Sequence, residues 1–290
     1  MKRRMICLGL AMLAGPALAG NVTTTAVESA ALGRALPYSI YVPDGAPRAG
    51  EAWPVLYLLH TYGGNEREWF GLGGIDKVLD KAIAAGTIAP MVVVTPGAGA
   101  NWFVDNPDPG GAGALSTAIA TDLVAAVEAA YPVAACRAGR AVGGASMGGN
   151  GALQIGLGHP ETYAAIAGFS AAIGLPLTGP DLPRDNPNNY SIVFGSPFDA
   201  GRYNKWNPFT LALQAAKAKP NERPAVWLTI GSEDKLPWVS ANFELYRQLR
   251  TSHIPVSLRI SAGRHDWSFW ESEIPLALQF VSTNLKSHCT

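Results

Sequence analysis

The sequence has few charged residues and no basic patch. Lysine, arginine, aspartate and glutamate make up 15% of its 290 residues, and the two signs balance at a net charge of zero at pH 7. Proteins that bind nucleic acids concentrate positive charge on one surface, so the sequence argues against a nucleic-acid partner. Apolar residues make up 48% of the chain, which is typical of a globular protein with a large core.

The sequence also lacks an apolar run long enough to span a bilayer and remain there. Three basic residues at 2–4 precede a short apolar stretch at 5–13, and small residues stand before Gly20. This order is typical of a cleavable secretory signal, and its apolar stretch is too short for a stable membrane anchor. We therefore predict a signal peptide at residues 1–19, a single domain at 20–290, and a secreted or periplasmic protein.

Cysteine is scarce, with three residues in the chain. Cys7 lies in the predicted leader, so Cys136 and Cys289 remain in the exported domain. An oxidising compartment favours a disulfide between two such residues. Cys136 precedes a predicted strand at the bottom of the sheet, and a last helix at 274–284 would return the chain there. The sequence permits a Cys136–Cys289 bridge and leaves open two free thiols.

Apolar stretches with strand and helix patterns alternate along the chain, which predicts an α/β fold with a mostly parallel sheet and helices on both faces. No repeat and no linker between two cores is present. The predicted strands cover 37–42, 55–60, 91–95, 141–144, 164–170, 226–231 and 256–261, and the predicted helices cover 75–85, 115–131, 152–157, 208–217, 239–249 and 274–284.

One serine lies in a motif that suits nucleophilic catalysis. Gly144-Ala145-Ser146-Met147-Gly148 is a G-x-S-x-G pattern between an apolar strand-like run and a helix-compatible run. A serine on such a sharp strand-to-helix turn projects its hydroxyl alone, and flanking glycines leave room for the two arms to pass. The helix N-terminus favours negative charge beside it. We predict that Ser146 is a nucleophile.

A base and an orienting carboxylate follow later strands. The chain has five histidines, and His265 follows the last predicted strand, while Asp234 follows the strand before it. Carboxyl ends of parallel strands lie at one edge, where α/β proteins hold their sites. The order Ser146, Asp234, His265 is that of α/β-hydrolases. Glu233 and Asp266 are the competing carboxylates.

Backbone amides complete the predicted site. His60 ends a predicted strand and is followed by a glycine-rich loop at 61–65. In serine hydrolases of this type that loop supplies one N–H to the oxyanion, and the residue after the nucleophile, here Met147, supplies the second.

These motifs resemble the esterase D-like family of α/β-hydrolases, whose members include S-formylglutathione hydrolases, feruloyl and acetylxylan esterase domains and mycolyltransferases. The resemblance extends over the whole predicted domain. The matching segments are Leu58–Gly64, Asn101–Asp105, Gly144–Leu153, Gly231–Asp234, Gly263–Trp267 and Trp270.

The resemblance implies an α/β-hydrolase fold with Ser146 as nucleophile, Asp234 as acid and His265 as base. It also implies that Tyr62 supplies the first oxyanion amide. The family usually carries glycine at the position of Thr61, and this departure leaves Thr61 and Tyr62 both as candidates.

Residues 174–207 are rich in proline, asparagine, aspartate and glycine and lack periodicity. A loop this long is usually functional, and it leaves the sheet on the catalytic side. We predict that it forms a cleft or lid insertion. Aromatic side chains near the matched motifs, Trp102, Trp267 and Trp270, are the predicted substrate-binding residues.

The sequence therefore predicts a secreted serine carboxylester hydrolase that works through an acyl-enzyme on a small-molecule or carbohydrate ester, such as an acetyl or hydroxycinnamoyl ester. This chemistry needs no metal or organic cofactor, and no residues have metal-ligand spacing. One alternative is an acyltransferase that passes the acyl group to a sugar or lipid hydroxyl. A second alternative is a non-catalytic binding protein with the same fold. The presence of all three groups, Ser146, Asp234 and His265, argues against it.

Overall fold

The computed structural model describes residues 19–178, 193–195 and 198–289. The predicted signal peptide, apart from Ala19, lies outside the described residues. So do 179–192 and 196–197 within the predicted 174–207 insertion.

Eight strands form one sheet in the order β1-β2-β4-β3-β7-β8-β9-β10. The first two strands pair antiparallel, β2 pairs antiparallel with β4, and every later pairing in this sheet is parallel. The strands are β1 (Asn21–Ser29), β2 (Arg34–Val42), β3 (Val55–Leu59), β4 (Val92–Pro96), β7 (Arg140–Ala145), β8 (Ala165–Phe169), β9 (Ala225–Gly231) and β10 (Val256–Ser261). A short hairpin, β5 (Asp105–Asn106) and β6 (Gly113–Ala114), lies apart from it. The predicted mostly parallel sheet is confirmed.

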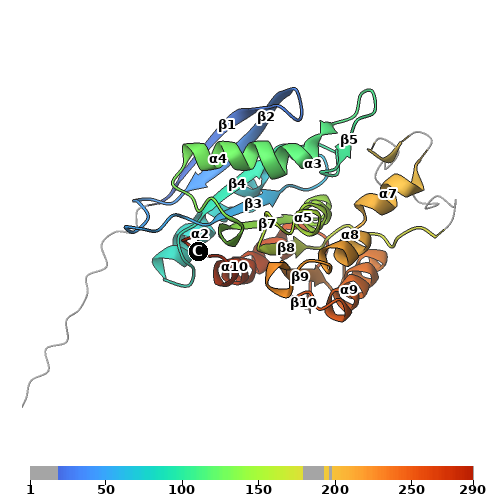
Figure 1. Cartoon of the computed structure of the whole chain (residues 1–290). Helices are drawn as coiled ribbons and strands as arrows, with labels where there is room; N and C mark the ends of the chain where they lie inside the picture. The colour runs from blue at the N-terminus through green and yellow to red at the C-terminus, as the bar shows by residue number, and fades with distance from the viewer. Residues whose placement is uncertain (1–18, 179–192, 196–197, 290) are drawn as a thin grey trace, which may run out of the picture.

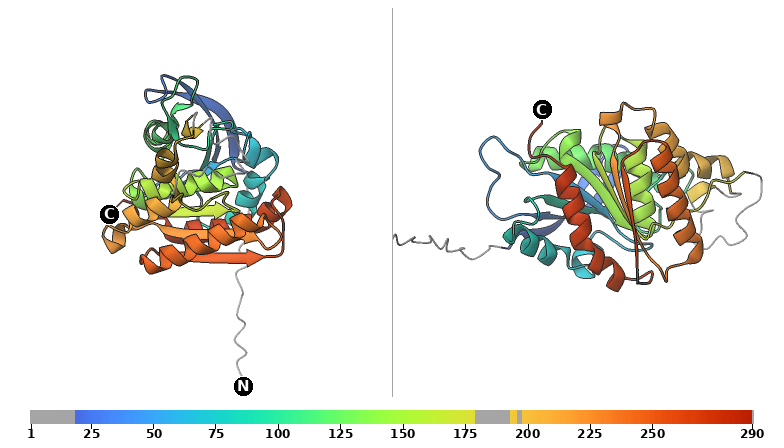
Figure 2. Two further views of the ribbon diagram at one scale, coloured as in Figure 1. Left: turned by 90° about the vertical axis from the view of Figure 1, so that its right-hand side faces the viewer. Right: turned by 90° about the horizontal axis from the view of Figure 1, so that it is seen from below.

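Helices cover both faces of the sheet, as Figures 1 and 2 show. One face carries α3 (Leu115–Ala118), the π-helical turn η1 (Ile119–Leu123), α4 (Val124–Ala130), α5 (Met147–Gly158), α8 (Pro208–Ala215) and α9 (Leu236–Thr251), and the other carries α1 (Glu68–Gly71), α2 (Ile75–Ala84) and α10 (Trp267–Asn284). The short helix α7 (Ala200–Trp206) precedes α8. In the described part of the chain, no helix combines the length and apolarity needed to cross a membrane.

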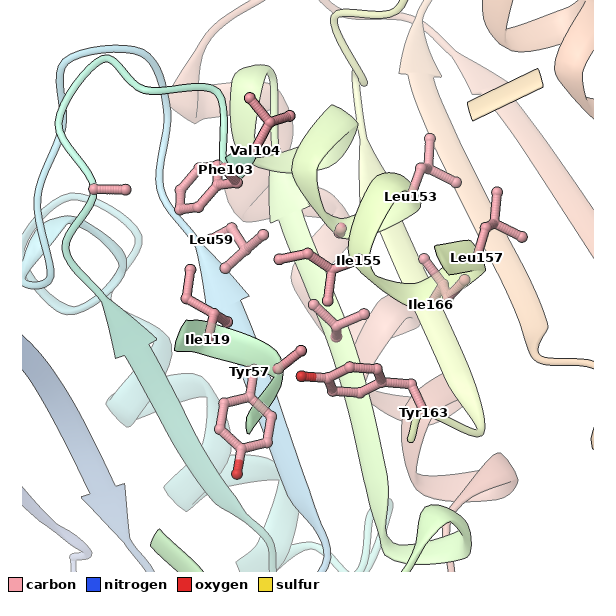
Figure 3. Packing of buried hydrophobic residues seen from close by; sticks show 14 of the residues in the cluster. Tyr57, Leu59, Phe103, Val104, Ile119, Leu153, Ile155, Leu157, Tyr163 and Ile166 are labelled. Carbon is pink, nitrogen blue, oxygen red and sulfur yellow. The ribbon is translucent and has the colours of Figure 1, made fainter. Parts of the chain in front are cut away.

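The sheet separates two apolar cores because alternate side chains of each buried strand point to opposite faces. On one face, Tyr57 and Leu59 of β3 pack against Ile155 of α5 and Ile119 of η1 (Figure 3). On the other, side chains from α1, α2 and α10 form the second core. The central strands are therefore buried on both faces, which fixes their carboxyl ends in one layer.

Strand β1 is not predicted by the sequence pattern. It is an edge strand whose side chains are mostly exposed, so it shows no apolar alternation. Asp122, in the π-helical turn η1, holds its end: the Ser29 hydroxyl and the Ala31 amide both donate to Asp122 Oδ2, at 2.6 and 2.9 Å. These bonds lower the pKa of the Asp122 carboxyl.

Three helices begin earlier than predicted: α5 begins at Met147 rather than at 152, and the early starts of α9 and α10 also matter for the site. The predicted start of α9 at 239 moves to Leu236, and the predicted start of α10 at 274 moves to Trp267. Asp266 caps α10 by accepting a hydrogen bond from the Phe269 amide at 3.1 Å, and Pro275 lies within the helix. Proline normally interrupts a helix, so the sequence pattern does not predict that α10 extends on the N-terminal side of Pro275.

The chain ends close to the segment that precedes β7. Cys136 and Cys289 form a disulfide with their Cα atoms 5.9 Å apart, a separation usual for this bond. The Lys286 amide donates to the Ala138 carbonyl at 2.8 Å, so the tail after α10 lies along the chain before β7. Of the two possibilities that the sequence leaves open, a bridge or two free thiols, the structure has the bridge.

Reduction of this disulfide should destabilise the protein. The bond joins residues 153 positions apart, and restraint of a loop of that size typically contributes about 2–4 kcal/mol. We expect Tm to fall by roughly 5–15 °C in reductant, at about 2–4 °C per kcal/mol for a chain of this size. Thermal melts of the exported protein with and without reductant test this. Two thiols that alkylate without prior reduction would contradict it.

Candidate active site

Four segments that carry predicted site residues meet at the carboxyl edge of the sheet. Ser146 follows β7, Asp234 follows β9, His265 follows β10 and Tyr62 follows β3. The strands that carry them are parallel and in register, so their ends lie side by side.

Ser146 occupies a strained turn between β7 and α5. Its φ is 57° and its ψ is −115°, a conformation that non-glycine residues rarely adopt. A Cβ at Gly144 would lie 2.3 Å from the Gly148 carbonyl oxygen, and one at Gly148 would lie 2.1 Å from that of Leu59. Glycine is therefore required on both sides of Ser146. The Ser146 amide donates to the Phe169 carbonyl at 2.9 Å, which fastens the turn to β8.

A continuous hydrogen-bond chain links the three predicted catalytic groups. His265 Nδ1 lies 2.9 Å from Asp234 Oδ2, and His265 Nε2 lies 2.8 Å from Ser146 Oγ. A carboxylate only accepts hydrogen bonds, so Nδ1 carries the proton and Nε2 is left to accept from the serine hydroxyl. The Asp234 side chain is fully buried, while that of His265 is 19% exposed. This is the geometry that a serine nucleophile and its base require.

The two competing carboxylates have other partners. Glu233 is more than half exposed and pairs with Arg264 at 3.2 Å. Asp266 accepts from the Phe269 amide as the cap of α10. Asp234 is the carboxylate that contacts His265.

Two tryptophans hold the imidazole of His265. The ring centroid of Trp238 lies 4.6 Å away, and Trp270 approaches edge-on at 5.1 Å. The ammonium of Lys235 lies 4.2 Å from the centre of the Trp238 ring. These contacts restrict how the imidazole can turn between Ser146 and Asp234.

The loop after β3 is the segment predicted to supply the first oxyanion amide. A Cβ at Gly148 would fall 2.6 Å from the His60 carbonyl oxygen, so this loop lies directly against the start of α5. Met147 is the first residue of α5, and first-turn amides have no acceptor within their own helix. The two predicted donor segments are therefore adjacent.

Thr61 is not available as the first donor. Its amide donates to Glu68 Oε2 at 2.8 Å, and its hydroxyl donates to Glu68 Oε1 at 2.6 Å. The choice that the sequence leaves open between Thr61 and Tyr62 therefore narrows to Tyr62. Glu68, at the start of α1, fixes the peptide immediately before that amide.

His60 joins this loop to the segment after β4. It is fully buried, the Ala98 amide donates to its Nε2 at 2.9 Å, and its Nδ1 lies 2.7 Å from the Thr61 carbonyl. Nε2 thus accepts and Nδ1–H donates. Burial lowers the pKa of the imidazole. A neutral His60 is a structural link between two loops at the edge of the site.

The structure corrects the prediction that three tryptophans line the cleft. Trp102 is 0% exposed and Trp270 is 4% exposed, so neither offers a surface to a substrate. Trp102 lies in a left-handed turn that places its ring in the core, and Trp270 packs on His265 because α10 begins early. Trp267 is half-buried against Trp69, with ring centroids 5.1 Å apart, and its contact with substrate stays a prediction.

Two glutamates near the site have no counterpart in the sequence analysis. Glu68 lies seven residues from Thr61, in no recognisable pattern. Glu273 is 3% exposed and accepts bonds at 3.0 Å from Thr229, Arg259 and Ser261, which anchors α10 across β9 and β10. The sequence signal that could have indicated a buried role for Glu273 is its place as a single acid among apolar residues on one face of the helix.

Within the described residues, no three histidine, cysteine, aspartate or glutamate side chains are grouped as metal ligands would be. The groups that meet at the site are a hydroxyl, an imidazole, a carboxylate and backbone amides. Such a set suits acyl transfer.

The sheet order, the turn at Ser146 and the groups around it define the α/β-hydrolase class. Among known proteins, residues 29–281 match the model of the family described as "Putative esterase", and the chain belongs to that family. Membership of this family makes the protein a carboxylic ester hydrolase.

Named relatives agree with this assignment. An acetyl esterase from Caldicellulosiruptor saccharolyticus is 25% identical over 234 residues, which cover 78% of this chain and 82% of that protein. A ferulic acid esterase structure has a TM-score of 0.74 and 26% identity, covering 92% of this chain and 98% of that one. An S-formylglutathione hydrolase from Agrobacterium tumefaciens has a TM-score of 0.73 at 18% identity, covering 92% and 96%, and at that identity shows the fold alone.

Replacement of Glu68 should weaken catalysis more than binding. Glu68→Gln replaces the charged acceptor of the Thr61 amide by a neutral one and so weakens this bond, which leaves the Tyr62 amide less firmly directed. Deletion of an oxyanion donor costs about 10²–10³ in kcat, and we expect this looser donor to cost about tenfold, with KM nearly unchanged. Steady-state kinetics on p-nitrophenyl acetate measure both constants.

Glu66→Gln is the matched control, because the Glu66 side chain pairs with exposed Arg67 rather than with Thr61. Thr61→Ser keeps both bonds to Glu68 and should retain activity. Equal kinetics for Glu68→Gln and Glu66→Gln would rule out this role for Glu68.

Proposed function

We propose that the chain is an exported serine carboxylester hydrolase in which Ser146, His265 and Asp234 act as nucleophile, base and orienting acid. The observation that carries this proposal is the unbroken hydrogen-bond chain from Ser146 Oγ through His265 to Asp234 Oδ2.

In the first half of the reaction, Ser146 Oγ attacks the ester carbonyl carbon as its proton passes to His265 Nε2. Asp234 holds Nδ1–H and stabilises the imidazolium that forms. The carbonyl oxygen becomes an oxyanion, to which the Met147 and Tyr62 amides donate. Collapse of this intermediate breaks the ester C–O bond, and His265 returns the proton to the departing alcohol.

In the second half, water replaces the alcohol. His265 Nε2 takes a proton from the water while the water oxygen attacks the acyl carbon of the Ser146 ester. The second tetrahedral intermediate releases the carboxylic acid, and the proton returns to Ser146 Oγ. The His265 side chain is partly exposed, so the imidazole is in contact with solvent.

The substrate class in this proposal is an acetyl or hydroxycinnamoyl ester of a carbohydrate. Two relatives support it, because they are named as an acetyl esterase and a ferulic acid esterase. The order of residues 1–19 supports export, where such esters would be met.

The acid can be tested against its sequence neighbour. Asp234→Asn should lower kcat by about 10³–10⁴, because an amide at this position stabilises the wrong histidine tautomer. Glu233→Gln is the control and should change kcat by less than about twofold, since its carboxylate is exposed and bonded to Arg264. Greater damage from Glu233→Gln would transfer the acid role to Glu233.

The fate of the acyl group distinguishes hydrolysis from transfer. With p-nitrophenyl acetate or methyl ferulate as donor and glycerol or xylose as acceptor, we expect free acid as the main product, because water reaches His265. Chromatography of the products with increasing acceptor measures the partition. Predominant formation of a new ester at low acceptor concentration would instead indicate an acyltransferase.

A further inference from the structure

The first residue of the predicted exported protein is bound by its backbone nitrogen. The Gly20 N–H donates to Asp80 Oδ1 on α2 at 2.9 Å, and the Tyr41 hydroxyl donates to the same oxygen at 2.7 Å. A Cβ at residue 20 would lie 2.3 Å from Tyr41 Cε2. The contact therefore requires glycine at this position.

The surroundings of this nitrogen carry negative charge. Asp76 lies one turn before Asp80 on the same face of α2, and its buried Oδ1 has no hydrogen-bond partner among the described residues. Tyr41 is 1% exposed, and burial, its bond to Asp80 and the charge of Asp76 all raise the pKa of its hydroxyl. Within the described residues, no lysine or arginine forms an ion pair with either aspartate.

We propose that Asp80 and Tyr41 form a binding site for the α-ammonium group of Gly20, which is created when the leader is cut after Ala19. The inference rests on the export part of the proposed function and is independent of the catalytic groups. The ligand is a primary ammonium on a residue without a side chain, supplied by this chain itself.

The cut turns a neutral donor into a charged one. A signal peptidase adds water across the Ala19–Gly20 peptide bond, so that hydroxyl goes to the Ala19 carbonyl carbon and hydrogen to the Gly20 nitrogen. The new amine takes up a proton, since α-amino groups have a pKa of about 8. An amide with one N–H becomes an ammonium with three, and its bond to Asp80 becomes charge-assisted.

The Ala19–Gly20 bond lies where it can be cut without disturbing the sheet. Ala19 is exposed, and β1 begins at Asn21. The bond between residues 19 and 20 therefore lies outside the sheet, and its cleavage needs no strand to unpair. Processing would strengthen the attachment of the edge strand β1 to α2 through Asp80.

The experiment compares two forms of the full domain, one that starts at Gly20 and one that starts at Ala19, each with and without Asp80→Asn. The form that starts at Gly20 should melt about 2–4 °C higher, a shift of the size expected for one charge-assisted contact in such a chain. Asp80→Asn should remove that difference. Equal melting of the two forms with Asp80 intact would overturn the proposal.

Two variants separate docking from processing. Gly20→Ala in the exported protein should still be cut after Ala19, yet its Tm should fall to that of the form starting at Ala19, because the new Cβ displaces the terminus from Tyr41. Asp44→Asn, at an exposed aspartate, is the matched control and should preserve the difference between the two forms. Unchanged melting of Gly20→Ala would contradict the proposed site.

N-terminal sequencing of the exported protein should read Gly20-Asn21-Val22, and any other start overturns the inference. Esterase kcat should be equal in all of these forms, because neither Gly20 nor Asp80 belongs to the proposed catalytic machinery. If the melting difference is absent while esterase activity is full, this inference fails and the catalytic assignment stands. If the melting difference is present while the Ser146, His265 and Asp234 assignment fails, the inference stands.

Discussion

The site depends on one steric constraint, the passage of β7 directly into α5 at Ser146. A Cβ at Gly144 would overlap the Gly148 carbonyl of the other arm, and a Cβ at Gly148 would overlap the Leu59 carbonyl at the end of β3. The positive φ of Ser146 is held by this packing. Three consequences follow from the same turn: the hydroxyl projects alone, the Met147 amide opens a helix, and the loop after β3 lies against Gly148. The proposed nucleophile and both proposed oxyanion donors are thus positioned by the same backbone turn.

The proposed acid and base are positioned by the starts of two helices. Asp234 stands two residues before α9, and His265 stands two residues before α10. The first turns of these helices carry Trp238 and Trp270, whose rings contact the imidazole. Buried Glu273 fastens α10 to the two strands that precede these residues in the chain. A base whose ring is confined in this way keeps the orientation that proton transfer requires.

The sequence was sufficient to predict the parallel sheet, its helical layers, and the three groups that the structure brings together, because strand ends in a parallel sheet meet at one edge. It was insufficient where burial or a distant partner decides the outcome. Strand β1 has no apolar alternation to detect. Pro275 lies inside α10, so the sequence pattern does not reveal that the helix begins at Trp267. Trp270 lies in the core rather than in the predicted cleft. Thr61 donates to Glu68 through its amide and its hydroxyl, and these two residues come into contact only through the path of the loop between them.

Labelling with a fluorophosphonate, followed by peptide mapping, tests the central claim most directly, because the reagent reports which serine hydroxyl is activated. Ser170 provides an internal comparison, since it also has a positive φ at a neighbouring strand end but is fully buried. Our account predicts one phosphonyl group per chain, on the peptide that contains Ser146, and its loss in His265→Ala. Labelling of Ser170 or any other serine, or undiminished labelling in His265→Ala, would contradict it.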